Sequence, residues 1–339
     1  MSEKVRSSYW DNVKLLLIFL VVLGHYFGYG FVYGDVSQGR WLFPNALYGF
    51  VYMFHMPLFS FVSGYFSKNV DKCRKRAVSQ YLIPYVVFNI ICVLMNYFLL
   101  GVPITSLVLE PYNHMWYLFS LFVWRLTAKT AERLPFSWLW ALALAVVLSV
   151  VTPVMEWNLI SRTILFWPFF LLGLGMNENQ VMRVKKLPRW LSGGVLLGML
   201  VLSVLILWKF DCSTYRLCFI GRRFGLNRAG ILGVCKLLLR YVTALVLGVC
   251  VLNLVPARKT PVTKLGESTM SVYLLHSLPK LRNTMNALNP MMGNLWFCLF
   301  WYTLWTLGAV VVFGNRWVSG VMDRFLTWLE GPFSKKKAA

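Results

Sequence analysis

Long apolar stretches recur along the whole chain, and short polar segments separate them. Most of the stretches are close to the roughly 20 residues that an α-helix needs to cross the hydrocarbon of a bilayer. They lie at residues 13–32, 46–66, 80–101, 115–128, 136–153, 162–177, 191–208, 229–254, 268–288 and 293–314. The fourth and sixth are short, and Pro279, Lys280 and Arg282 interrupt the ninth. The pattern predicts an all-α fold, a polytopic transmembrane helical bundle of about ten spans.

Basic residues are concentrated between these stretches, in alternate segments. They precede the first span, follow the second, fourth, sixth and eighth spans, and end the chain: Lys4, Arg6 and Lys14; Lys68, Lys72, Arg74, Lys75 and Arg76; Arg125, Lys129 and Arg133; Arg183, Lys185, Lys186 and Arg189; Arg258, Lys259 and Lys264; Lys335, Lys336 and Lys337. Loops rich in Lys and Arg stay on the cytoplasmic side of a membrane. With this span count all of these segments fall on one side, so we expect both termini to be cytoplasmic.

We therefore expect one integral-membrane domain over residues 1–339, with a basic cytoplasmic tail at 315–339. No small-residue cleavage site follows the first stretch, so the first span should be retained. One loop departs from the charge pattern, because its basic residues would lie outside: Lys209, Arg216, Arg222, Arg223 and Arg228. This loop could attract an anionic acceptor or lie against anionic lipid headgroups. Its Cys212 and Cys218 could pair in an oxidising compartment.

Composition supports a membrane protein and argues against nucleic-acid binding. Hydrophobic residues make up 58% of the chain and charged residues 14%, with a mean hydropathy of +0.61. A soluble domain would carry nearly twice this charged fraction. The net charge of +22 could suggest a nucleic-acid partner. Because the basic residues cluster in alternate loops, we interpret the charge as a topology signal and expect membrane lipids, but no nucleic acid, as partners.

The first candidate site is a histidine inside the first span. An ionisable side chain at membrane depth costs roughly 2 kcal/mol or more, so it is a functional candidate by default. At about 100° per residue, Lys14 and His25 differ by about 20° around the helix axis, and Asp11 and His25 by about 40°. These three side chains therefore share one face, with His25 roughly 16 Å deeper than Lys14. The arrangement favours a charged entrance above a buried acid–base group.

A second histidine, His55, lies in the middle of the second span, two residues before Pro57. Pro57 frees a backbone carbonyl one turn earlier, which His55 could satisfy. This structural role and a role in catalysis both remain open. Ser63 lies eight residues further on the same face and could offer its hydroxyl to a polar ligand.

Two further histidines lie at or near the spans. His114 precedes Trp116 and Tyr117, which are residue types typical of a membrane interface, although they could also form an aromatic platform for a sugar ring. His276 lies near the middle of the ninth stretch, and it could serve packing or function. Glu267 precedes that stretch, where a carboxylate suits the positive end of a helix.

The remaining candidates are mainly cations. Lys236 and Arg240 are four residues apart on one face of the eighth span, where they could bind an anion or extend toward the membrane surface. Arg76 and Tyr85 flank the start of the third span, where an arginine is normally a topology marker. The histidines lack a paired spacing with carboxylates, and no cofactor-binding motif is present. We therefore expect no metal site and no tightly bound cofactor.

Several sequence blocks together resemble the acyltransferase-3 family of integral-membrane O-acyltransferases, and within it the branch described as fucose 4-O-acetylase-like. The blocks occur in the family's order: Tyr9-Trp10-Asp11-Asn12-Val13-Lys14 through Leu23-Gly24-His25; Phe54-His55-Met56-Pro57-Leu58-Phe59 with Ser63-Gly64-Tyr65; Arg76 with Pro84-Tyr85; His114-Met115-Trp116-Tyr117-Leu118; and Ser271-Val272-Tyr273-Leu274-Leu275-His276. In many members an arginine stands eleven residues before the first-span histidine. Lys14 occupies that position here, and it keeps the charge but loses the bidentate fork.

The resemblance implies transfer of an acetyl or other short acyl group from cytoplasmic acyl-CoA, with acetyl-CoA as the expected donor. The acceptor would be a hydroxyl of a glycan or lipid-linked glycan of the cell envelope, and the protein would lie in the inner (plasma) membrane. His25 would be the general base, with His55, Lys14 and Asp11 in the same catalytic group. A proton-coupled transporter of an anionic solute, which uses the intramembrane histidines as a relay, is the alternative, and a structural subunit is a third.

Overall fold

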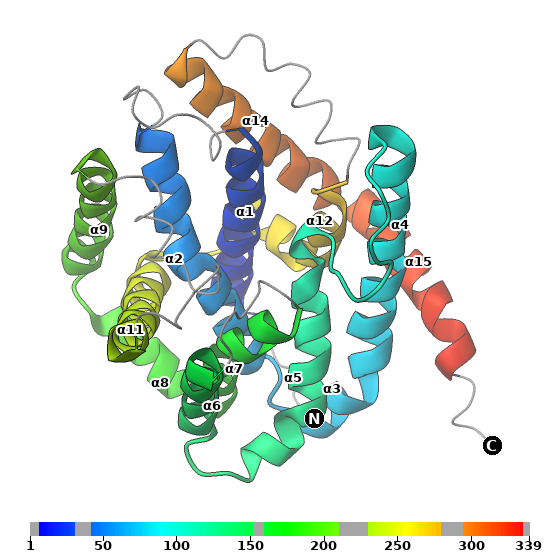
Figure 1. Ribbon diagram of the computed structural model, residues 1–339, viewed down its shortest axis with the longest axis horizontal. Coiled ribbons are helices and arrows are strands. Elements are labelled where there is room, and N and C mark those ends of the chain that lie inside the picture. The colour runs from blue at the N-terminus through cyan, green and yellow to red at the C-terminus, as the bar shows by residue number, and fades with distance from the viewer. Residues whose placement is uncertain (1–6, 31–41, 152–158, 210–229, 279–293, 335–339) are drawn as a thin grey trace.

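The computed structural model describes residues 7–30, 42–151, 159–209, 230–278 and 294–334, and every regular element in these ranges is helical (Figure 1). The longer helices are α1 (Ser8–Gly30), α2 (Leu42–Tyr65), α4 (Ile83–Leu100), α5 (Trp116–Glu132), α6 (Ser137–Val151), α7 (Leu159–Gly175), α9 (Arg189–Lys209), α11 (Gly230–Leu254), α14 (Leu295–Phe313) and α15 (Arg316–Ser334). Shorter pieces are α3 (Val70–Ala77), η2 (Val78–Leu82), η3 (Asn113–Met115), α8 (Glu178–Arg183), η4 (Val184–Lys186), η7 (Pro261–Glu267) and α12 (Thr269–Leu275). The predicted all-α class is confirmed for these residues.

Six helical segments among the described residues are long and apolar enough to cross a membrane. They are α1, α2, the continuous stretch Val70–Leu100, α9, α11 and α14. A seventh is added if α7 and the segment Glu178–Lys186, which meet at 99°, form one broken span. The helix α6 is apolar but shorter, and α5 has only 17 residues. The count of about ten spans and the cytoplasmic position of both termini therefore remain predictions.

Two parts of the chain differ from the sequence-based expectation. The stretch predicted as the ninth span contains α12, which ends at Leu275, and its remainder from 279 lies outside the described residues. The segment predicted as a basic tail contains α15, a helix of 19 residues. The basic loop with its cysteine pair, at 210–229, also lies outside the described residues.

The helices α2 and α7 cross with their backbones in direct contact. A Cβ atom on Gly64 would lie 1.9 Å from the carbonyl oxygen of Phe170, and one on Gly173 would lie 1.9 Å from the carbonyl oxygen of Phe61. Only glycine therefore allows the two backbones to touch at these positions, as small residues do at many membrane helix contacts. This contact holds α2 and its Ser63 in a fixed position.

The beginning of α1 is anchored to the segment before α12. The Asn12 amide donates hydrogen bonds of 2.9 Å to the carbonyl oxygens of Pro256 and Arg258, and its oxygen accepts one of 2.7 Å from Thr263. Gly266 packs against the Asp11 carbonyl, where an added Cβ would lie 2.0 Å from the oxygen. Because α12 follows directly, these contacts fix His25 on α1 relative to His276 at the end of α12.

Candidate functional site

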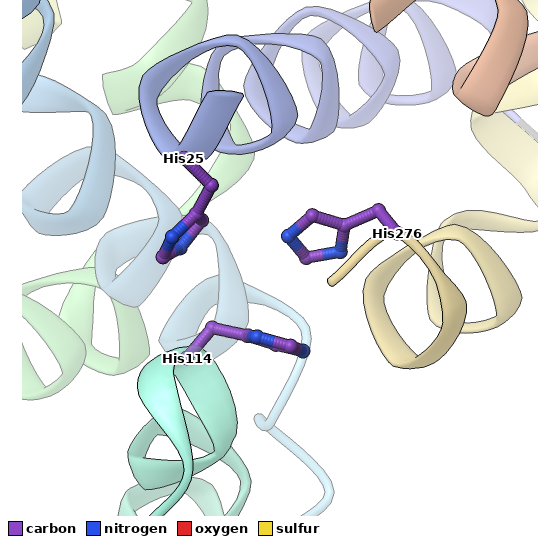
Figure 2. A group of neighbouring side chains, drawn as sticks. All are labelled: His25, His114 and His276. Carbon is purple, nitrogen blue, oxygen red and sulfur yellow. The ribbon is translucent and has the colours of Figure 1, made fainter. Parts of the chain in front are cut away.

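Three histidines that are far apart in the sequence meet in the interior. His25 comes from α1, His114 from η3, and His276 directly follows α12 (Figure 2). The ring centroids are 5.6 Å apart for His25 and His114, 5.3 Å for His25 and His276, and 4.4 Å for His114 and His276. His114 is 2% exposed and His276 is fully buried, whereas His25 is half-buried. We refer to these three residues as the histidine cluster.

Backbone hydrogen bonds hold the cluster in place. The Nδ1 atom of His276 lies 2.9 Å from the Tyr273 carbonyl oxygen and 3.1 Å from that of Val272, so this nitrogen carries the proton. The lone pair of His276 is then on Nε2. The Tyr26 hydroxyl donates to the His276 carbonyl at 2.9 Å, and the Tyr273 hydroxyl donates to the His114 carbonyl. Tyrosine hydroxyls therefore hold the backbone at His276 and at His114.

A cavity of about 220 Å³ lies beside the cluster, and we call it the cation-flanked cavity. Its lining combines apolar and aromatic side chains with two cations and five residues that carry a hydroxyl group: Lys14, Phe59, Val62, Ser63, Phe66, Tyr81, Tyr117, Leu118, Leu121, Arg125, Thr269, Met270 and Tyr273. An apolar lining with a few convergent polar groups is typical of a ligand site.

The cavity adjoins the histidine cluster through two tyrosines. Ser63 and Tyr117 share a hydrogen bond of 2.8 Å at the wall of the cavity. The ring of Tyr117 lies 6.1 Å from that of Tyr273, and Tyr273 lies 4.8 Å from His114. A molecule in the cavity would therefore be separated from the cluster by little more than one aromatic ring.

The two cations of the cavity differ in their partners. The Lys14 ammonium forms an ion pair of 2.7 Å with the buried Asp11 and lies 5.6 Å from the centroid of the Phe66 ring. Arg125 packs over Tyr81 at 4.6 Å and donates to Gln80 at 3.2 Å, and neither of these partners carries a negative charge. Two positive charges beside an apolar cavity can bind an anionic group of a ligand.

Three of the predicted site residues lie elsewhere in the core. The Nδ1 atom of His55 lies 2.8 Å from the Val51 carbonyl, one helical turn earlier, and the ring packs against Tyr52. His55 is not one of the three converging rings, but it is near enough to interact electrostatically with His25. Pro57 frees a different carbonyl, that of Met53. Trp116 is buried against Phe166, and the hydroxyl of the buried Tyr85 donates to the Val108 carbonyl.

The other predicted binding residues do not line the cation-flanked cavity. Arg76 is exposed on α3, and Glu267 is exposed at the end of η7. Lys236 is half-buried and Arg240 is buried, both on α11, and neither belongs to the lining of the cavity. The structure therefore brings together Asp11, Lys14, Ser63 and Tyr117 at the cavity, and His25, His114 and His276 in the cluster.

Sequence reasoning missed two arginines near this site. Arg125 follows a predicted span, so the sequence alone indicates only a topology marker at this position. Arg162 is buried at the beginning of α7, with its guanidinium 5.4 Å from the ring of Trp116, and its charge interacts with His25. The signal for Arg162 in the sequence is its position at the start of an apolar stretch. Burying a charge there costs free energy, so such a residue is a functional candidate.

These features define a helical membrane protein with a buried histidine cluster beside a cation-flanked cavity. The chain belongs to the acyltransferase-3 family, because the acyltransferase domain of that family matches residues 7–319. It is therefore a membrane acyltransferase. No curated protein matches the chain, and no solved structure matches it.

Proposed function

We propose that the protein is an O-acyltransferase of the inner (plasma) membrane, similar to the fucose 4-O-acetylase-like branch of its family. It would move an acetyl or other short acyl group from cytoplasmic acyl-CoA to a hydroxyl of a cell-envelope or exported glycan. One observation carries the proposal: the cation-flanked cavity adjoins the histidine cluster at Tyr117 and Tyr273. Acyl transfer needs an anionic, thioester-bearing donor to be held beside a base, and this arrangement fits that need.

In the proposed complex, acyl-CoA binds with its anionic part at Lys14 and Arg125. A thioester in the cavity would then lie beside the hydroxyls of Ser63 and Tyr117. Because one hydroxyl of this pair donates to the other, the second hydrogen stays available for the oxyanion that forms on the acyl carbon. Hydroxyl donors at such a position stabilise the charge that develops in the transition state.

His25 acts as the general base in this mechanism. His25 does not line the cavity, so the acceptor hydroxyl would have to reach past Tyr273, between the acyl carbon and the His25 ring. As its oxygen attacks the acyl carbon, its proton passes to His25, the new C–O bond forms and the C–S bond breaks. The proton is then returned to the thiolate of CoA, so that the products are an ester and a free thiol. A base positioned in this way typically contributes about 10²–10⁴-fold to the rate. The buried charge of Arg162 near His25 adds stabilisation for the negative charge on the reacting oxygen.

The test is transfer of label from acetyl-CoA, labelled in its acetyl group, to the glycan fraction of membranes that contain the protein. We expect base-labile label with the natural chain and at least about a 10²-fold loss with His25→Ala at the same level of folded protein. Arg74→Gln, an exposed change on α3 that is outside the cavity, is the control and should keep full transfer.

Two results would contradict parts of the proposal. Donor consumption without a labelled glycan would remove the glycan acceptor but keep acyl transfer. Unchanged transfer by folded His25→Ala would remove His25 as the base. The transporter alternative makes a different prediction, because a transporter leaves acyl-CoA intact, and membership of an acyltransferase family disfavours it.

A further inference from the structure

The histidine cluster has the composition of a metal site. His25, His114 and His276 each offer one ring nitrogen, and these three nitrogens all lie within 4.8 Å of one another. Figure 2 shows the three rings converging on a shared space from three different segments. We propose that the cluster binds one divalent transition-metal ion of the zinc type through these three nitrogens. This inference concerns binding and goes beyond the proposed acyl transfer.

The hydrogen bonding of the rings supports this assignment. The Nε2 atom of the fully buried His276 has no hydrogen-bond partner among the described residues, although its Nδ1 atom is satisfied by two carbonyls. A metal-binding histidine usually donates its other N–H to a carbonyl or carboxylate, which fixes the lone pair toward the ion. His276 has this arrangement before any ion is bound.

His114 is a second buried ring with unused capacity. Neither of its nitrogens makes a hydrogen bond of normal length and angle to any described residue, and its side chain is 2% exposed. The backbone of Tyr273 interacts with the ring only outside that geometry. A buried polar group without a partner costs free energy, typically about 1–3 kcal/mol. An ion that binds His114 and His276 together would use both orphaned lone pairs, and this explains why the two rings lie only 4.4 Å apart.

The ligand set indicates which ions would bind. Imidazole nitrogens suit zinc, copper, nickel and cobalt, whereas magnesium and calcium need oxygen ligands. Zinc lies about 2.0–2.1 Å from histidine nitrogens, which brings tetrahedral ligands within about 3.3 Å of one another. The rings must therefore close slightly around the ion. Three protein ligands leave the fourth position open for water or a hydroxyl group.

This proposal departs from the expectation of no metal site that spacing along the chain had suggested. That expectation considered ligands close together in the sequence, whereas the three histidines come from α1, η3 and the end of α12. The positive charge of Arg162, which interacts with His25, opposes cation binding and should limit its affinity. Since a nitrogen of His25 that coordinates an ion cannot also take a proton, the loaded cluster would lack the proposed base.

The test uses the full-length protein, purified in detergent with a tag that contains no histidine and then stripped with a chelator. It is dialysed against Zn²⁺ or Co²⁺, and metal per chain is measured by elemental analysis, with the visible spectrum of Co²⁺ as a report on coordination. We expect one ion per chain and cobalt bands typical of a tetrahedral site. His114→Ala and His276→Gln should each weaken binding at least tenfold. His55→Gln is the matched control, because His55 is buried but outside the cluster.

The thermal unfolding midpoint of each variant without metal shows whether it is folded. If only one of the two cluster variants folds, that variant is enough for the comparison with the natural chain. No stoichiometric binding by the natural chain, or equal binding by folded His114→Ala or His276→Gln, would overturn the proposal. Binding that is lost equally in His55→Gln would also overturn it.

An activity measurement on the same samples separates this proposal from the proposed function. Stoichiometric binding with inhibition of acyl transfer by Zn²⁺ would support both. Binding with activity in the loaded form alone would support the metal site and overturn His25 as the general base. If the natural chain binds no metal after dialysis but still transfers the acyl group at its full rate, the metal site is overturned and the acyltransferase proposal stands.

Discussion

At the scale of single residues, the two cations beside the cavity are not equivalent. Lys14 is paired with the Asp11 carboxylate at 2.7 Å, whereas Arg125 has no carboxylate within ion-pair distance among the described residues. The Asp11 carboxylate therefore compensates much of the positive charge that Lys14 presents to a ligand. Arg125 supplies net positive charge and a planar group that can bind two phosphate oxygens at once.

We therefore expect Arg125→Gln to weaken binding of the donor. The Michaelis constant for acetyl-CoA should rise about tenfold, which corresponds to about 1.4 kcal/mol, with a smaller change in turnover. Initial rates over a range of donor concentrations measure this effect. Arg74→Gln is the control, because it removes an exposed positive charge on α3 outside the cavity. An unchanged Michaelis constant for Arg125→Gln would show that the anionic part of the donor binds elsewhere.

The hydroxyl pair at the cavity wall makes a different prediction. Tyr117→Phe keeps the ring but removes the hydroxyl that is hydrogen-bonded to Ser63. If this pair holds the oxyanion, turnover should fall about 10²–10³-fold, while the Michaelis constant for the donor changes little. A rise in the Michaelis constant with normal turnover would instead assign Tyr117 to ground-state binding.

From the sequence, residues of the candidate site could be related to one another only where they lie on the same helix. His25 and Lys14 could be identified because both lie on one helix, where the helical period relates them. His114 and His276 are candidates in the sequence, singly and within the family's blocks, but the sequence does not show that they meet His25. For His276 this meeting depends on contacts of Asn12 and Gly266 with residues distant in the sequence. Arg125 was missed because a basic residue after an apolar stretch also has an ordinary topological explanation.

At the scale of helices, the contact of α2 with α7 has no room for a side chain. Gly173→Ala would place a methyl group 1.9 Å from the Phe61 carbonyl and force the helices apart. We expect a loss of roughly 1–3 kcal/mol in unfolding free energy and a lower thermal midpoint in detergent. Gly198→Ala on α9 is the matched control, since an added Cβ there meets nothing within 4 Å. Equal midpoints for both variants would contradict a tight crossing.

Helix positions were easier to predict than helix lengths. The apolar stretches at 46–66 and 191–208 correspond to α2 and α9, because continuous apolar runs bounded by polar loops fix a helix on their own. The stretch at 268–288 gave only the short α12 within the described residues. The helix α15 was not predicted, because its charged residues Asp323 and Arg324 interrupt the apolar run and hydropathy alone does not detect an amphipathic helix.

At the scale of the whole molecule, the orientation in the membrane rests on the basic segments. The basic residues around α3 are expected in the cytoplasm, and the loop after α4 on the other side. In a chain without native cysteines, Arg74→Cys should therefore react with a membrane-impermeant thiol reagent only in inside-out vesicles. Thr105→Cys, which is also exposed, should react in intact cells. Labelling of both positions from one side would mean that Val70–Leu100 does not cross the membrane.

The origin of the three histidines in α1, η3 and the end of α12 also has a consequence for synthesis of the protein. A nascent chain that has emerged only as far as α11 carries His25 and His114, but it lacks the third member of the cluster. The anchor of Asn12 on Thr263 is missing at that stage as well. The donor cavity is also incomplete at that stage, because Thr269, Met270 and Tyr273 of its wall have not yet been made. Under the proposed chemistry, a partly inserted chain would therefore not hold its thioester donor, and activity would begin only after the segment through His276 has been inserted.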